Sequence, residues 1–225
     1  MNNEEIIKAL YDQTLMGNAP VVLELTQQAL GMGIGPDSIL FDALIPSLEE
    51  VGARFERGDY FVPEMLIAGK AMSGALNVLR PLLAETGAES VGTYVMGTVK
   101  GDVHDIGKNL VNIMLEGAGF TVIDLGVQTP PEKFIAAIQE HKPDIVGMSA
   151  FLTTTMPMFK VNIHEISKAG LRDQVIIMVG GAPVTQEYAD AVGADGYAAD
   201  ASTAVRLAKE LIQRRRDKVL VGAGS

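Results

Sequence analysis

Five short apolar runs, each followed by a stretch with helical spacing of its apolar residues, fill the sequence from Val91 onward. The apolar runs span residues 92–99, 121–125, 145–149, 175–179 and 196–198. The helical stretches span residues 106–118, 132–141, 156–169, 185–192 and 203–215. This alternation predicts an α/β fold, a doubly wound, five-stranded parallel sheet of the flavodoxin or Rossmann-like kind. Ligands of such a sheet bind at the carboxyl ends of its strands.

The first 88 residues follow another pattern, in which apolar residues recur at helical spacing throughout. Four helices are expected, over residues 4–16, 19–30, 36–56 and 63–84. Because the joins are short, these helices predict an antiparallel four-helix cap domain. We therefore expect a cap domain over 1–88, a linker of small residues near 85–90 and a sheet domain over 89–216. Residues 217–225 are left out of the expected fold as a tail.

The composition excludes several classes of site and partner. Acidic residues number 28 against 18 basic, a net charge of -10, which argues against a nucleic-acid partner. The absence of cysteine excludes disulfides, thiolate zinc sites and cysteine nucleophiles, and it leaves three histidines for any metal ligation. There is no signal peptide and no apolar run of about 18 residues, so we expect a cytoplasmic protein without a membrane span.

The loop after the first expected strand contains the strongest candidates for functional residues. It reads Gly97-Thr98-Val99-Lys100-Gly101-Asp102-Val103-His104-Asp105-Ile106-Gly107, which is neither a dinucleotide-binding nor a Walker sequence. A carboxylate close to a histidine fixes the imidazole tautomer and prepares the other ring nitrogen for a metal. One histidine cannot hold a free ion, so the metal would arrive in a macrocycle. The alternative is a solvated turn in which Asp105 caps the next helix.

Three elements in order resemble the signature of cobalamin-binding domains. Asp102 to Gly107 match Asp-x-His-x-x-Gly, and Gly180-Gly181 match the Gly-Gly pair after the fourth strand. Ser149-Ala150-Phe151 stand at the Ser-x-Leu element, with phenylalanine in place of leucine. Residues 44–55 and 58–66 resemble the helical cap of methionine-synthase-type B12-binding modules. The chain as a whole looks like a corrinoid protein of anaerobic methyltransferase systems.

The resemblance implies cobalamin or a related corrinoid as the cofactor, in methylcobalamin, Co(I) and Co(II) forms. His104 would be the lower axial ligand of the cobalt. Asp102 would hydrogen-bond the other ring nitrogen of His104, and Ser149 would extend that chain of hydrogen bonds.

Further contacts with the cofactor are implied around this ligand. Val103, Asp105, Ile106 and Gly107 would lie along the corrin or its tail, and Gly180-Gly181 would leave a slot for the displaced base. The segment after the third strand would add further contacts through Ser149, Phe151, Leu152, Thr153 and Thr154. Phe61 and Met65 would cover the upper face of the corrin, although a core position is the default for such residues.

The implied function is that of a methyl carrier rather than of a complete enzyme, and no catalytic residue is assigned. A substrate-specific methyltransferase would supply a methyl group from methanol, a methylamine, a betaine or an aromatic methyl ether. A second methyltransferase would pass that group to a folate or a thiol, and a reductive activation protein would be a further partner. Three alternatives remain: a cobalamin-dependent sensor, a mutase subunit, and a flavodoxin-like domain that binds nothing.

Overall fold

The computed structural model describes residues 1–86 and 90–222, and the chain divides into two compact units. Unit 1 comprises Met1–Ser90 and Ile113–Gly119, and unit 2 comprises Val91–Asn112 and Phe120–Ser225. The expected linker at 85–90 includes residues 87–89, which lie outside the described residues. Among the residues that the structure describes, no helix is both long enough and apolar enough to span a membrane.

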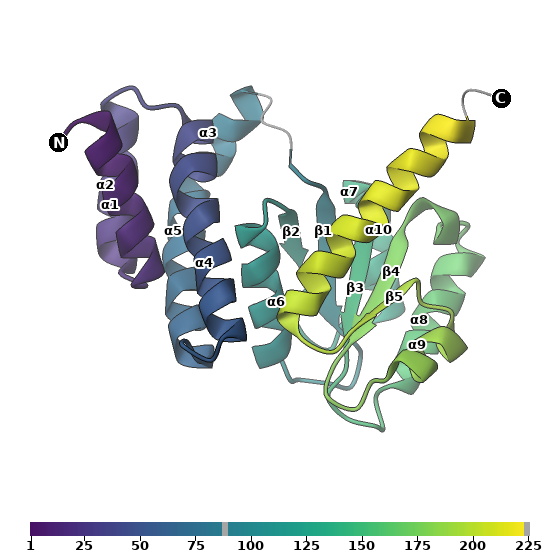
Figure 1. Ribbon diagram of the computed structural model, residues 1–225. Coiled ribbons are helices and arrows are strands. Elements are labelled where there is room, and N and C mark those ends of the chain that lie inside the picture. Colours follow the sequence, from purple (N-terminus) through teal and green to yellow (C-terminus); the bar gives the residue numbers. More distant parts are fainter. Residues whose placement is uncertain (87–89, 223–225) are drawn as a thin grey trace. The chain divides into compact units, whose positions relative to one another are not determined.

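Unit 1 is helical throughout its N-terminal part (Figure 1). Its helices are α1 (Asn3–Leu15), α2 (Ala19–Gly31), α3 (Pro36–Ser38), the π-helical η1 (Ile39–Leu44), α4 (Ile45–Glu56) and α5 (Val62–Thr86). Asn2 starts α1 with a capping box, in which Asn2 and Glu5 each accept the backbone N–H of the other. Ile6, Leu10, Leu44, Met65, Met72 and Leu79 are fully buried and form the core of the bundle.

The third expected helix, 36–56, is continuous in the chain but changes its winding. The Ile45 N–H donates to the Leu40 carbonyl, five residues back, at the end of η1. Pro46 follows in the first turn of α4, where it has no N–H to donate. The π-helical turn η1 thus ends where a proline interrupts the ordinary hydrogen-bond pattern. The spacing of apolar residues in the sequence does not reveal this change.

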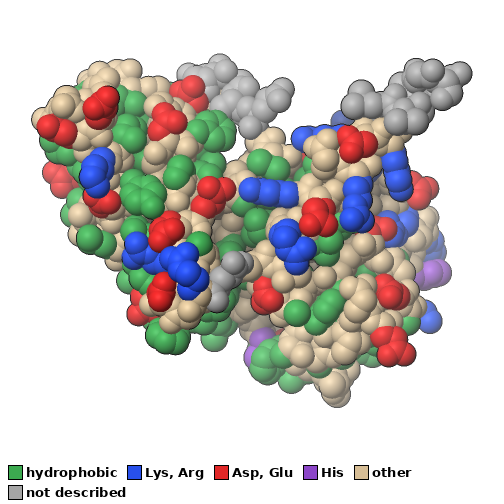
Figure 2. All heavy atoms as spheres, viewed as in Figure 1, with side chains coloured by type: hydrophobic (Ala, Val, Ile, Leu, Met, Phe, Trp, Pro, Cys, Tyr) green, Lys and Arg blue, Asp and Glu red, His purple; other side chains and the backbone are tan. Residues whose placement is uncertain are grey.

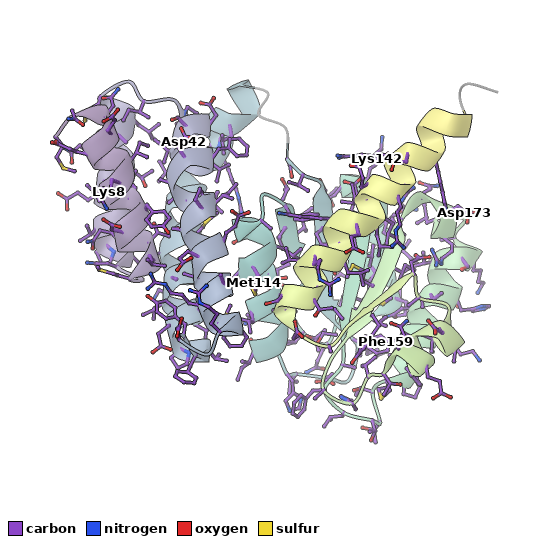
Figure 3. The ribbon with its side chains drawn as sticks, viewed as in Figure 1. Lys8, Asp42, Met114, Lys142, Phe159 and Asp173 are labelled. Atoms are coloured by element: carbon purple, nitrogen blue, oxygen red, sulfur yellow. The ribbon has the colours of Figure 1, made fainter. Side chains whose placement is uncertain are left out.

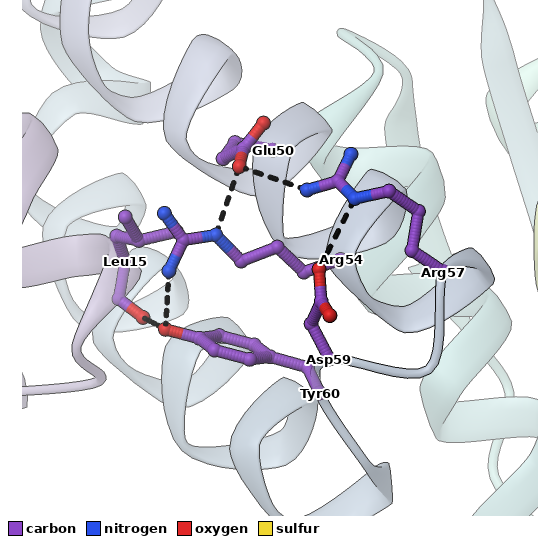
Figure 4. Close-up of polar contacts among 6 residues, drawn as sticks. All are labelled: Leu15, Glu50, Arg54, Arg57, Asp59 and Tyr60. Carbon is purple, nitrogen blue, oxygen red and sulfur yellow. Dashed lines mark hydrogen bonds and ion pairs between the residues drawn. The ribbon is translucent and has the colours of Figure 1, made fainter.

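A polar network fixes the turn between α4 and α5 (Figure 4). Arg54 Nε donates to Glu50 Oε1 at 2.8 Å and Nη1 donates to the Tyr60 hydroxyl at 3.2 Å. The guanidinium carbon of Arg54 also lies 5.2 Å from the centre of the Tyr60 ring. Arg57 bridges Glu50 and Asp59 beside it. The hydrogen bond from Arg54, with the charge of Arg57, lowers the pKa of Glu50.

Unit 2 is a parallel sheet in the order β2-β1-β3-β4-β5. The strands are β1 (Thr93–Thr98), β2 (Thr121–Asp124), β3 (Ile145–Ser149), β4 (Ile176–Gly180) and β5 (Gly196–Ala198). The helices are α6 (Ile106–Gly117), α7 (Pro131–His141), α8 (Pro157–Lys168), the short η2 (Arg172–Gln174), α9 (Gln186–Val192) and α10 (Ala201–Gly222). This order is that of flavodoxin-like sheets, so the predicted fold class is confirmed.

The sheet is covered on both faces. Phe134 of α7, Phe159 of α8 and Ala189 of α9 join one buried cluster with alternate residues of the central strands, such as Val95 and Ile177. Figure 3 labels Phe159 in this layer, while α10 lies across the opposite face of the sheet (Figure 1). Strands buried on both faces explain the continuous apolar runs in the sequence.

The last helix is longer than expected. Residues 217–222, taken from the sequence as part of a tail, continue α10, and residues 223–225 lie outside the described residues. Arg215 donates to the carbonyls of Asp173 and Gln174, and Arg216 donates to that of Val91. Figure 2 shows Lys and Arg side chains gathered over α10. The three hydrogen bonds of Arg215 and Arg216 hold this helix to its own unit.

Candidate functional site

The loops after β1 and β3 meet at the carboxyl edge of the sheet. β1 and β3 are neighbours, and the chain leaves β1 toward β2 on the other side. The Val99 N–H donates to the Ser149 carbonyl at 3.0 Å, so the two loops start side by side. Doubly wound sheets bind their ligands at such a switch point, where successive connections leave in opposite directions.

Asp102 is the buried centre of this edge. Its side chain has no exposed surface, and both of its carboxylate oxygens accept hydrogen bonds. Oδ1 accepts from the His104 backbone N–H at 3.0 Å and contacts His104 Nδ1 at 2.7 Å. Oδ2 accepts from the N–H groups of Phe151 and Leu152 at 2.8 and 3.2 Å and from the Thr155 hydroxyl at 2.7 Å.

These donors decide the charge of Asp102. Burial by itself raises the pKa of the carboxyl, but the hydrogen bonds from Thr155, His104 and Phe151 outweigh it and hold the pKa well below its usual value. Asp102 is therefore a carboxylate at neutral pH. Because a carboxylate can only accept, the proton in the contact with His104 lies on Nδ1, and in a neutral imidazole the lone pair is then on Nε2.

His104 presents this imidazole at the surface. Its side chain is 43% exposed, and its ring stacks on that of Phe151 with a centroid distance of 4.3 Å and an angle of 27°. Orientation by Asp102 on one edge and by Phe151 on one face leaves Nε2 available to a ligand. A neutral imidazole held in this way by a carboxylate is the usual form of a metal-binding histidine.

Apolar side chains surround His104 on the same loops. Val103, Ile106, Phe151 and Leu152 are 58%, 65%, 51% and 40% exposed. Figure 2 shows hydrophobic side chains at the surface of this edge of unit 2. Large apolar residues gathered at a surface indicate a binding site. The adjacent Thr153 and Thr154 are exposed and offer hydroxyls, so the edge suits a broad ligand with an apolar face and a polar rim.

The hydroxyl that reaches Asp102 was predicted at the wrong residue. Ser149 was expected next in the hydrogen-bond chain, whereas the group that donates to Asp102 is Thr155. Ser149 pairs with Thr98 and Gly180 in the sheet, and Thr155 is reached by the turn that follows Leu152. The run Thr153-Thr154-Thr155 signals hydroxyls at this edge, but only the folded turn shows that the third of them faces inward.

The glycines of the site are explained by different features of the structure. A Cβ on Gly181, whose φ is +130°, would collide with the Ala150 carbonyl, and a Cβ on Gly180 would lie 2.9 Å from the Ala198 carbonyl. The backbone itself therefore requires this pair. A Cβ on Gly107 would meet nothing within 4 Å, so the packing of the chain does not explain the glycine, while close approach of a ligand would.

The two residues expected from the cap have opposite environments within unit 1. Phe61 is 66% exposed, and its backbone N–H donates to Glu64 Oε2 at 3.0 Å. Met65 is fully buried in the helical core. Of the two, only Phe61 presents a side chain that a ligand can contact in this conformation.

The comparisons with known proteins agree with this geometry. Two family models described as B12 binding domain match the chain, one over residues 92–222 and the other over residues 6–80. The chain belongs to the B12-binding family. The predicted cobalamin or corrinoid cofactor is thereby confirmed.

Relatives of this B12-binding protein include named corrinoid proteins. A dimethylamine corrinoid protein of Methanosarcina barkeri is 43% identical over 213 residues, which cover 94% of this chain and 100% of the relative. A trimethylamine corrinoid protein of Methanosarcina acetivorans is 41% identical over 207 residues, 91% of this chain and 95% of the relative. A chain in the crystal structure of the methanol:cobalamin methyltransferase complex MtaBC from Methanosarcina barkeri superposes with a TM-score of 0.82 at 30% identity, covering 93% of this chain and 80% of that chain.

The residues of this B12-binding protein fit the cofactor of the family. An imidazole with a free Nε2 stands among exposed apolar side chains. Gly107, at the start of α6, leaves open space around its Cα, and Thr153 and Thr154 offer polar groups at the rim. Because a corrin ring supplies four nitrogens to its metal, one imidazole from the protein is enough for ligation. His104 is the residue that presents one at this edge.

Proposed function

We propose that this protein is a corrinoid-binding methyl carrier and that His104 Nε2 is the lower axial ligand of its cobalt. The observation that carries the proposal is the buried Asp102 carboxylate that holds an exposed imidazole in one tautomer. When bound, the corrinoid supplies a metal centre that can accept and release a methyl group. No residue of the chain is assigned to catalysis.

Asp102 would keep the proton of His104 on Nδ1 and so keep Nε2 free to bind. Four donors besides the imidazole already hold its carboxylate, which is therefore not available to take the proton itself. Whether neutral or protonated, the imidazole would stay paired with the same carboxylate, which would therefore hold His104 in place at the site.

The other site residues would shape the surface that receives the corrin. Val103, Ile106, Phe151 and Leu152 would exclude water from the lower face of the ring, and Thr153, Thr154 and Ser149 would bind its polar groups. Asp105 lies exposed at the start of α6, near Gly107. The Gly180-Gly181 turn would border the nucleotide tail.

The methyl donor is proposed from the relatives. Their names specify dimethylamine and trimethylamine corrinoid proteins, and a solved neighbour is part of a methanol:cobalamin methyltransferase complex. We infer that a substrate-specific methyltransferase for a methylamine or for methanol loads this chain. A second methyltransferase with a folate or thiol acceptor would unload it, and a reductive activation protein would return the cobalt to its active state.

Isotope labelling can identify the axial ligand without any partner enzyme. Protein uniformly labelled with ¹⁵N is loaded with unlabelled hydroxocobalamin and reduced to the Co(II) form. In the electron paramagnetic resonance spectrum, ligation by a protein nitrogen gives two-line superhyperfine splitting, and ligation by the cofactor's own base gives three lines. The two-line pattern is expected, and His104→Ala is expected to abolish it. A three-line pattern in the unaltered protein would refute the proposed ligand.

The carrier role has a separate test. The reduced holoprotein is mixed with dimethylamine, trimethylamine or methanol, each with a methyltransferase that uses that substrate. Formation of the methylated holoprotein is expected for one of the three donors. An adenosyl upper ligand after isolation from cells, with no methylation by any donor, would instead favour the sensor alternative.

A further inference from the structure

Lys108 is a buried lysine beside the proposed axial ligand. It lies in the first turn of α6, four residues after His104 in the sequence, and is only 2% exposed. Lysine is rarely buried unless its charge is paired. Its Nζ donates to Asp124 Oδ2 and to Asn109 Oδ1, both at 2.6 Å. A buried ammonium paired with the half-exposed carboxylate of Asp124 needs a reason other than the packing of an ordinary core.

The partner of Lys108 shapes the turn after β2. Asp124 is the last residue of β2, and its second oxygen, Oδ1, accepts the Gly126 N–H at 2.8 Å. The Lys108 ammonium therefore fixes a carboxylate that in turn fixes the start of the loop 126–129. One side chain of α6 thus orients a loop that lies across the sheet edge.

The loop 126–129 holds the backbone of both Asp102 and His104 through hydrogen bonds. The Gln128 N–H donates to the Asp102 carbonyl at 3.0 Å. The Gly126 carbonyl accepts the Thr98 N–H at 2.9 Å, and the Thr98 hydroxyl donates to the His104 carbonyl at 3.0 Å. A continuous path of hydrogen bonds therefore runs from Lys108 through Asp124 and the loop to Asp102 and His104.

The loop is also under backbone strain. Gln128 has a φ of +51°, in the left-handed region that residues with a side chain seldom adopt. Such conformations persist where the surroundings impose them, and they cluster at functional sites. The hydrogen bond of Gln128 to Asp102 and the anchoring of the loop by Asp124 are the constraints that hold it.

We propose that Lys108 and Asp124 are positioning residues for the axial ligand: their ion pair holds the loop 126–129 against the Asp102–His104 loop and so fixes the imidazole before any corrinoid binds. The inference rests on the proposed role of His104. It assigns to the buried lysine a task that neither the signature motif nor the packing of α6 requires.

The first test uses the protein without cofactor, so that it does not depend on the proposed function. Lys108→Met removes the ammonium and keeps an unbranched apolar chain. Amide hydrogen exchange followed by NMR should then be about tenfold faster at Gln128 and His104, whose N–H groups donate to Asp102, and unchanged in β3 and β4. Lys100→Met is the matched control, because Lys100 lies exposed in the same loop as His104.

Asp124→Asn provides a second variant should Lys108→Met fail to fold. Asp124 is 42% exposed, and asparagine can still accept the Gly126 N–H while the charge that pairs with Lys108 is lost. The same two amides should exchange faster. Unchanged exchange at Gln128 and His104, or equal acceleration throughout β3 and β4, would overturn the positioning role.

The holoprotein gives the second readout. In ¹⁵N-labelled protein loaded with hydroxocobalamin and reduced, Lys108→Met should lower the fraction of Co(II) that shows the two-line splitting, and Lys100→Met should not. Full two-line splitting in Lys108→Met would overturn the inference. Its absence in the unaltered protein would instead refute the proposed ligand, so the two failures are distinguishable.

Discussion

At the scale of single residues, the contact between Asp102 and His104 is local, because both residues lie within one short motif. The Asp-x-His spacing lets a carboxylate reach the Nδ1 of the next-but-one side chain, as the contact of 2.7 Å shows. Thr155 was not predictable, because its hydroxyl is brought to Asp102 by a turn far along the chain. The N–H groups of Phe151 and Leu152 also escaped prediction, since backbone donors leave no mark in a sequence.

Gly107 allows a test of the site, because the fold has room for a side chain at this position. Alanine there meets nothing within 4 Å, so Gly107→Ala should raise the stability of the apoprotein by up to about 1 kcal/mol through its better helix propensity. If the glycine serves close approach of the corrinoid, the affinity for hydroxocobalamin should fall at least about tenfold. Calorimetric titration and chemical denaturation measure the two effects.

Gly74→Ala is the control for that variant. Gly74 lies inside α5, and a Cβ there also meets nothing within 4 Å. It should gain similar stability with no loss of affinity. Unchanged binding of hydroxocobalamin to Gly107→Ala would contradict the assigned role of this glycine.

Burial of the Tyr94 phenol predicts that the free energy of unfolding falls with rising pH in the alkaline range. Its phenol is buried, which raises its pKa far above the usual value, and its hydroxyl lies 3.8 Å from the Met178 sulfur, a weak acceptor. Because the folded pKa exceeds the unfolded value of about 10, the contribution to stability is complete below pH 10 and is lost as the pH rises above it. Tyr94→Phe removes this loss.

The two proteins should therefore be about equally stable at pH 8, because the weak contact with sulfur adds little. At pH 11 the Tyr94→Phe variant should be more stable by about 1.4 kcal/mol, since ionisation favours only the unfolded parent chain. Urea denaturation at both pH values gives the comparison. If the difference in stability between Tyr94→Phe and the parent protein does not change with pH, the phenol ionises in the folded protein as readily as in the unfolded chain.

At the scale of elements, the five strands were predictable because buried parallel strands are apolar on both faces. Predicted and observed bounds coincide for β3 and β5, and they differ by one residue for β4. The end of α10 was not predictable from the charged run at 214–218. Arg215 and Arg216 bind carbonyls outside their own helix, and such tertiary contacts leave no mark in the local sequence.

The turn between β4 and α9 yields a prediction about backbone geometry. Gly181→Ala should destabilise the protein by about 3 kcal/mol or more, because its φ of +130° is strained for alanine and its Cβ would strike the Ala150 carbonyl. Gly193→Ala is the matched control, with a φ of +80° and nothing within 4 Å. It should cost only about 1–2 kcal/mol. Equal losses in thermal and urea denaturation would show that the collision with Ala150 relaxes freely.

At the scale of the whole molecule, the change of hydrophobic period near residue 90 predicted two parts, and the structure also has two units. The boundary between the units is not set by that change of period alone, because Ile113–Gly119 groups with the helices of unit 1. The sequence shows α6 as one amphipathic helix and gives no sign that its two halves belong to different units. Leu115 is fully buried and Ala118 nearly so, which makes this segment part of a core.

Cutting the chain between Gly87 and Ala88 tests this division. A protease site inserted there would yield fragments 1–87 and 88–225, and the second would carry Ile113–Gly119, which completes unit 1. The fragments should therefore stay together on size-exclusion chromatography after cleavage, at the elution volume of the uncut protein. Fragment 88–225 expressed alone should bind a hydrophobic dye such as ANS more strongly than the uncut protein, because the apolar residues of that segment lose their partners. Two fragments that separate after cleavage, each with a cooperative unfolding transition, would show instead that the boundary lies at the linker.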